Sequence, residues 1–215
     1  SHQMQQPYRD MMLLQTWFSP AFPTGAFTYS HGLETAIQEG LVTDAASLTN
    51  WISCLLAHGS GRNDALFIKA AYEGDEGANA LCLALCAGKE RWQETLELGQ
   101  AFSRVVNASH DASLQDGLAY PVAIGRASRK EGLDLNATLQ SFLQAFAATL
   151  ISVGVRIIPI GQQAGQDCLI SLYPVIGEVS TEAATATLSA LGSASMLSDL
   201  MAIKHENATP RVYRT

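Results

Sequence analysis

Ser30 and His31 have the residue types of a catalytic nucleophile and its general base. They are adjacent in the sequence, and adjacent residues on a helix point about 100° apart. Their side chains therefore cannot form the hydrogen bond that nucleophilic catalysis needs. The sequence also lacks paired carboxylates in an apolar setting and the Glu-x-x-His motif of helical metalloenzymes. We therefore assign no catalytic residue and do not expect an enzyme.

Cys82 and Cys86 lie four residues apart, so on a helix they would share one face. Two thiolates do not close a metal site, and the leucines around them are typical of buried free thiols. We expect all four cysteines to be free. His31 and His205 are each isolated among residue types that do not bind metals. The sequence therefore predicts no metal site and no cofactor site.

The charge pattern limits the possible partners. Gly88-Lys89 is followed by Glu90, where a nucleotide-binding P-loop needs Ser or Thr. A net charge of −7 over 215 residues, without a basic stripe, argues against nucleic acid. The most membrane-like window, residues 142–160, contains Arg156 and Pro159, which favours a buried helix over a membrane span. Free cysteines and no signal peptide predict a cytoplasmic protein.

Three stretches have unusually specific residue combinations. Residues 19–34 read Ser-Pro-Ala-Phe-Pro-Thr-Gly-Ala-Phe-Thr-Tyr-Ser-His-Gly-Leu-Glu, in which two prolines and a glycine precede a helical pattern. Residues 156–166 read Arg-Ile-Ile-Pro-Ile-Gly-Gln-Gln-Ala-Gly-Gln, and residues 201–215 place His205-Glu206 before Arg-Val-Tyr-Arg. Together, and in this order, they resemble the landmarks of the UreF family of urease accessory proteins, which are helical chaperones for the nickel site of urease.

The resemblance implies a maturation factor that works through protein contacts. Such proteins bind a scaffold accessory protein, UreD (also called UreH), and through it recruit the GTPase UreG to urease apoprotein. Nickel and GTP are then handled by the partners, which agrees with the missing P-loop. The family also forms dimers, so a homodimer is expected. The rival hypothesis is a helical small-molecule-binding protein or enzyme that uses a cavity between helices.

Partner contacts are expected at the first landmark and in the C-terminal tail, residues 204–215. Arg and Tyr, which are enriched at interface hot spots, recur in the tail, and the tail is net positive on an acidic body. The resemblance strengthens this assignment. The predicted partner-binding residues are Tyr29, Ser30, His31, Glu34, Lys204, His205, Glu206, Arg211, Tyr213 and Arg214.

Several roles stay open at this level. Arg156 ends a long apolar helix, where it would complement the negative end of the helix dipole; an ion pair across an interface is the alternative. Gln162, Gln163 and Gln166 are expected to satisfy backbone groups after the proline turn. An arginine finger from the tail into the GTPase is a minor alternative to docking.

Abundant Ala and Leu, with apolar residues repeating every three or four positions, predict an all-α fold. We expect a single-domain helical bundle of about ten helices, with a flexible N-terminus at 1–10 and a partner-binding tail at 204–215. Thr43 or Asp44 is expected to cap the third helix. The expected helices span 11–18, 29–39, 44–58, 64–72, 78–87, 91–106, 120–129, 136–158, 166–174, 181–191 and 196–203.

Overall fold

A computed structural model describes residues 2–24 and 30–191 of the chain. Within these residues it contains α-helices and one short 3-10 helix, and no strand. The predicted all-α class is therefore confirmed. The helices are α1 (His2–Trp17), α2 (Ser30–Gln38), α3 (Ala45–His58), α4 (Ser60–Tyr72), α5 (Ala78–Ala84), α6 (Lys89–His110), α7 (Tyr120–Lys130), α8 (Leu135–Ile157) and α9 (Gln162–Thr185), followed by the 3-10 turn Leu188–Ala190.

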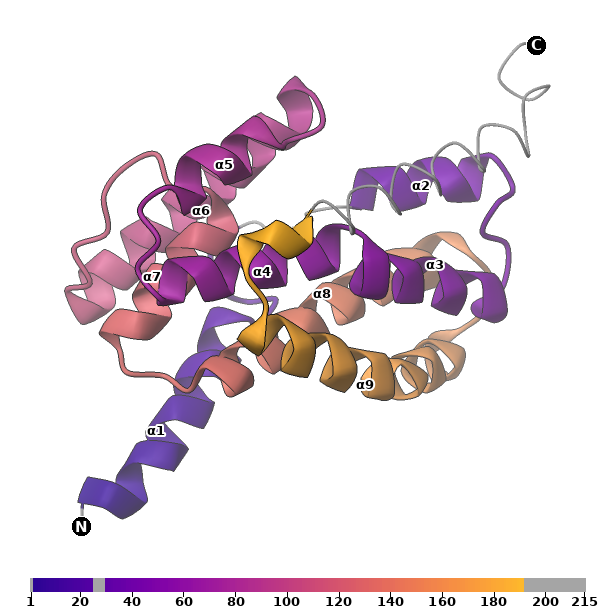
Figure 1. The fold of residues 1–215 in the computed structure, drawn as a ribbon. Coiled ribbons are helices and arrows are strands. Elements are labelled where there is room, and N and C mark those ends of the chain that lie inside the picture. Colours follow the sequence, from indigo (N-terminus) through magenta and orange to yellow (C-terminus); the bar gives the residue numbers. More distant parts are fainter. Residues whose placement is uncertain (1, 25–29, 192–215) are drawn as a thin grey trace.

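Helix α4 runs through the centre of the helical body (Figure 1). It packs on α7 on one side and on α3, α8 and α9 on the other. All its residues from Asp64 to Ala71 are buried, which is expected of a helix surrounded by others. Helices α8 and α9 pack along each other and close the body beside α3. The N-terminal half of α1 projects away from this body (Figure 1).

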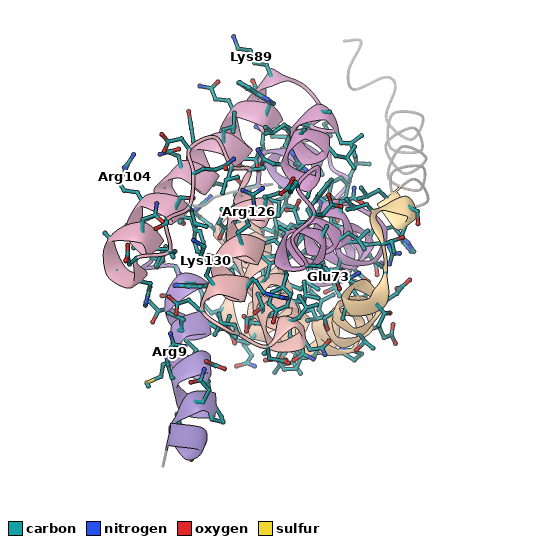
Figure 2. The ribbon with its side chains drawn as sticks, turned by 60° about the vertical axis from the view of Figure 1, so that its left-hand side comes forward. Arg9, Glu73, Lys89, Arg104, Arg126 and Lys130 are labelled. Carbon is teal, nitrogen blue, oxygen red and sulfur yellow. The ribbon has the colours of Figure 1, made fainter. Side chains whose placement is uncertain are left out.

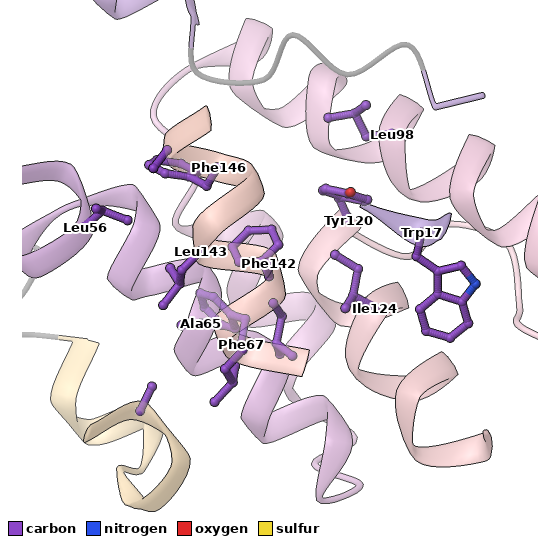
Figure 3. Packing of buried hydrophobic residues seen from close by; sticks show 14 of the residues in the cluster. Trp17, Leu56, Ala65, Phe67, Leu98, Tyr120, Ile124, Phe142, Leu143 and Phe146 are labelled. Atoms are coloured by element: carbon purple, nitrogen blue, oxygen red, sulfur yellow. The ribbon is translucent and has the colours of Figure 1, made fainter. Parts of the chain in front are cut away.

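An aromatic cluster fixes the N-terminal segment to the core. The ring of Trp17 meets Phe102 of α6 edge-on at 5.3 Å between centroids, and Phe22 lies 5.8 Å from the same ring. Phe102 in turn contacts Tyr120 of α7 at 5.9 Å. Figure 3 shows Trp17 and Tyr120 among the buried side chains of α7 and α8. The first half of the 19–34 landmark is thus bound to the core through Phe22.

Two helices begin earlier than the sequence suggests. Helix α1 begins at His2, so residues 2–10, expected to be a flexible segment, belong to this helix. Helix α4 begins at Ser60, whereas its expected start was residue 64, and its first turn contains Gly61. A Cβ at Gly61 would lie 3.0 Å from the backbone oxygen of Leu55. Gly61 therefore permits a close approach between α3 and α4.

The prediction of two helices at 166–174 and 181–191 is wrong, because α9 is continuous from Gln162 to Thr185 and contains Pro174. Proline removes one backbone hydrogen bond from a helix. Here both halves bury apolar residues, including Leu172 and Ile176 on either side of the proline, and Val179 and Ala183 beyond it. This packing holds the helix together across the proline. The expected helix 196–203 lies outside the described residues.

Helix α8 is long and apolar enough to cross a membrane by length and composition alone. However, 56% of its most apolar window is buried within the protein, as in the core helix of a globular fold. Asp134 caps its first turn by accepting a hydrogen bond from the backbone N–H of Ala137 at 2.9 Å. The helix ends at Ile157, just before Pro159, where the sequence predicted the stop.

Asp44 caps α3 through a capping box with Ser47, as predicted. Its carboxylate accepts hydrogen bonds from the Ser47 backbone N–H (2.8 Å) and hydroxyl (2.7 Å), and these bonds lower the pKa of Asp44.

A carboxyl with a lowered folded-state pKa stabilises the fold above its unfolded pKa, about 4, and loses that contribution as pH falls. The Asp44→Asn variant should therefore lose less stability than the unchanged chain when the pH falls from 5 to 3, as measured by urea unfolding. Equal pH slopes for both proteins would contradict this.

Candidate docking surface

Two of the three landmarks meet on one surface. The guanidinium of Arg156, in the last turn of α8, lies 3.7 Å from the carboxylate of Glu34 on α2 (Nη2 to Oε1). Both side chains are partly exposed to water, at 57% and 42% exposure. An exposed pair of this kind contributes little to stability, about 0–1 kcal/mol. The pair therefore adds little to the attachment of α2 to α8.

Helix α2 presents the first landmark with one buried face and one exposed face. Ser30 and Leu33 point into the body, with 8% and 0% of their surfaces exposed, whereas His31 is exposed and Glu34 half-exposed. The opposite burial of Ser30 and His31 agrees with our exclusion of a nucleophile–base pair. Among the predicted partner-binding residues of α2, His31 and Glu34 are presented to solvent.

The second landmark forms the turn between α8 and α9. Pro159 follows the end of α8, and Gly161, with φ +85°, starts α9 in a backbone conformation that favours glycine. Gly165 lets the two helices approach closely, since a Cβ there would lie 2.6 Å from Cγ2 of Val155. Pro159, Gly161 and Gly165 thus have structural roles, and they fix the backbone that carries Arg156.

The glutamines of this landmark are surface groups. Gln163 donates to Asp167 one turn further along α9, at 3.0 Å, so it does not satisfy the backbone as we expected. Gln162 and Gln166 are exposed and make no side-chain hydrogen bond within the described chain. Both line a groove between α8 and α9, about 370 Å³ in volume, together with Arg156. We call the exposed set Glu34, Arg156, Gln162 and Gln166 the Arg156 surface.

The groups on this surface are charged or form hydrogen bonds. It offers a guanidinium that donates hydrogen bonds, a carboxylate that accepts them and two amides that can do both. Among the described residues, no group of three or more His, Cys, Asp or Glu is arranged to hold a metal ion. All four cysteines are free thiols; Cys82 is buried, and its burial raises the pKa of its thiol, which makes it a poor ligand and nucleophile.

The remaining predicted partner-binding residues lie outside the described residues: Tyr29, Lys204, His205, Glu206, Arg211, Tyr213 and Arg214. Of the residues that the structure does describe, sequence reasoning missed the pairing of Glu34 with Arg156, because 122 positions separate them and no local pattern links them. The available signal was that Glu34 ends the first landmark and Arg156 begins the second. The groove beside them has no sequence signal at all.

Comparison with known proteins agrees with these landmarks. Residues 42–173 match the family model UreF. The chain is 46% identical to a protein of Cereibacter sphaeroides named urease accessory protein UreF, over 95% of this chain and 98% of that one. Proteins of the same name from Ruegeria pomeroyi and Rhizobium etli are 41% and 40% identical, over 96% and 95% of this chain and 97% and 96% of theirs.

Proposed function

Since the chain belongs to the UreF family of urease accessory proteins, which is non-catalytic, we propose that it is the chaperone that allows nickel insertion into apo-urease. The observation that carries this proposal is the Arg156 surface, where two family-like landmarks, far apart in sequence, form one exposed patch. A protein that acts through contacts needs such a patch more than it needs a cavity.

The partners proposed are the scaffold protein UreD/UreH, the GTPase UreG and urease apoprotein, in the cytoplasm. The Arg156 surface is proposed to contact the GTPase, because Arg156 and Glu34 offer the charged groups that orient a docking partner. The tail, with Arg211, Tyr213 and Arg214, is proposed to bind the scaffold. Nickel and GTP then reside on the partners, and this chain couples GTP turnover to nickel delivery.

The experiment that tests this function is complementation. A urease-positive host that lacks the gene for its own UreF-family protein is supplied with this chain. Urease activity and the nickel bound to urease are then measured. Restored activity with nickel in urease supports the proposal. Full-level urease apoprotein without nickel or activity, despite expression of the cognate partners, would contradict it.

Homodimerisation is proposed through the exposed face of α8. From Leu135 to Val155 this helix carries no charge, and most of its half-exposed positions are small or polar, among them Ser141, Ala145 and Thr149. In a two-fold interface residues near the axis meet their own copies, so an uncharged face avoids like-charge repulsion.

Ala145→Glu should therefore convert a dimer to a monomer, measured by light scattering at equal concentration. Ala184→Glu, at a half-exposed site on α9, is the matched control and should leave the dimer intact. A dimer that survives Ala145→Glu would exclude this face.

A further inference from the structure

Charge is distributed unevenly over this acidic protein. Helices α2, α3 and α9 contain no lysine or arginine, whereas α7 contains Arg126, Arg129 and Lys130 and no carboxylate. Arg104 on α6 lies on the same side of the molecule as Arg126 and Lys130 (Figure 2). These four residues, which we call the basic face, lie on the α6–α7 side, whereas the Arg156 surface is formed by α2, α8 and α9.

The cations of the basic face are not neutralised by ion pairs with the described residues. Arg104 and Arg126 make no hydrogen bond or ion pair there. Lys130 donates to the backbone oxygen of Ala112, and Arg129 lies over the ring of Tyr72 at 5.5 Å and donates to its backbone oxygen. These acceptors carry no net charge, so four positive charges remain on one surface.

The nearest carboxylate in the sequence does not compensate them. Glu131 follows Lys130 directly, but its carboxylate is already paired with Arg9 at 2.5 Å and lies 3.5 Å from Nδ1 of His110. The spacing of Arg126, Arg129 and Lys130 at i, i+3 and i+4 places them on one side of α7. The helix therefore holds its cations in a fixed arrangement, as a docking site requires.

We propose that the basic face is a further docking surface, which binds a carboxylate-rich protein surface of the urease assembly. This inference rests on the proposed function and extends it, since a protein that bridges several partners needs a separate face for each of them. Arg guanidinium groups match carboxylates in a planar, two-bond geometry. The charge separation between α7 and the helices α2, α3 and α9 also orients the chain between two partners of different charge.

An acidic protein fits this face better than nucleic acid or a membrane. Those polyanions present uniform negative charge over a large area, and the chain as a whole carries −7. Asp111 and Asp116, from the loop between α6 and α7, are exposed carboxylates close to the same elements. They would repel an extended polyanion, whereas a protein surface can place single carboxylates against single cations.

The test is a charge reversal, Arg104→Glu with Arg126→Glu, in the full chain. Binding to the cognate UreD/UreH-type scaffold, to the GTPase and to urease apoprotein is measured separately, each at two salt concentrations. Lys89→Glu with Arg91→Glu, on the same α6 but outside the basic face, is the control with equal net charge. Thermal unfolding verifies that both variants are folded.

We expect the reversal to weaken binding to at least one of the three proteins about tenfold or more, with a smaller salt dependence, because like charges across an interface are strongly unfavourable. The control should stay within about twofold. Unchanged binding to all three, or equal losses in the control, would overturn the inference and leave the proposed function standing. If the unchanged chain bound duplex DNA or phosphatidylserine vesicles more tightly than it bound any of the three proteins, the inference would also be overturned. If the unchanged chain bound none of the three proteins, the proposed function would fall with it.

Discussion

Gly125→Ala is expected to lower the free energy of unfolding by about 3 kcal/mol, since overpacking of a core usually costs 1–3 kcal/mol and here the obstacle is rigid. A Cβ at Gly125 of α7 would lie 2.4 Å from the backbone oxygen of Ile68 and 2.7 Å from Cβ of Ala71, both on α4. Neither atom can rotate away, so α4 and α7 must separate. Because a whole domain is stable by only about 5–15 kcal/mol, much of the protein's stability depends on this contact.

Gly177→Ala is the matched control, because it changes the same residue type in a helix, but a Cβ there meets nothing within 4 Å. It should be neutral or stabilise the protein by up to about 1 kcal/mol. Urea unfolding of the two variants and the unchanged chain gives the comparison. Equal midpoints for Gly125→Ala and Gly177→Ala would show that α4 and α7 do not pack as described.

Arg156→Glu is expected to reduce urease activation at least about tenfold in the complementation assay. Reversing one charge at a docking surface slows association with the partner and destabilises the complex. The fold should survive, because Arg156 and Glu34 are both partly exposed and an ion pair of this kind is weak. Lys89→Glu changes an exposed cation at the start of α6, outside the Arg156 surface, and should leave activation unchanged (Figure 2).

The exchange Glu34→Arg with Arg156→Glu separates recognition from stability. It restores an ion pair between α2 and α8, but the positive charge is now on α2 and the negative charge on α8. Recognition by a partner predicts that the exchange stays inactive. If the exchange restored activation, the pair would be a structural link between helices, and the Arg156 surface would not be where a partner docks.

The elements that the sequence predicted best are those with a local chemical cause. Asp44 and Ser47 define a cap within one turn, and Pro159 ends α8 wherever the rest of the chain lies. Such features depend on neighbours within four residues, which a sequence displays directly.

The features that the sequence did not predict depend on packing between distant segments. Pro174 would break an isolated helix, and only the burial of α9 against α8 and α3 explains why it does not. The early start of α4 was not predicted, because nothing near Gly61 in the sequence reveals its close approach to Leu55. The same holds for the candidate site, since Glu34 and Arg156 meet only after α2 has packed on α8.

The central claim, that this chain acts by binding other proteins of urease maturation, is tested most directly by light-scattering chromatography with its cognate UreD/UreH-type scaffold. The full chain is compared with a version that ends at Ile203 and so lacks Arg211, Tyr213 and Arg214. We expect the full chain to co-elute with the scaffold at the mass of a complex, and the shortened chain to elute alone. If the full and the shortened chain both co-elute with the scaffold, the scaffold contact lies outside the tail. If the full chain forms no complex, the account is contradicted.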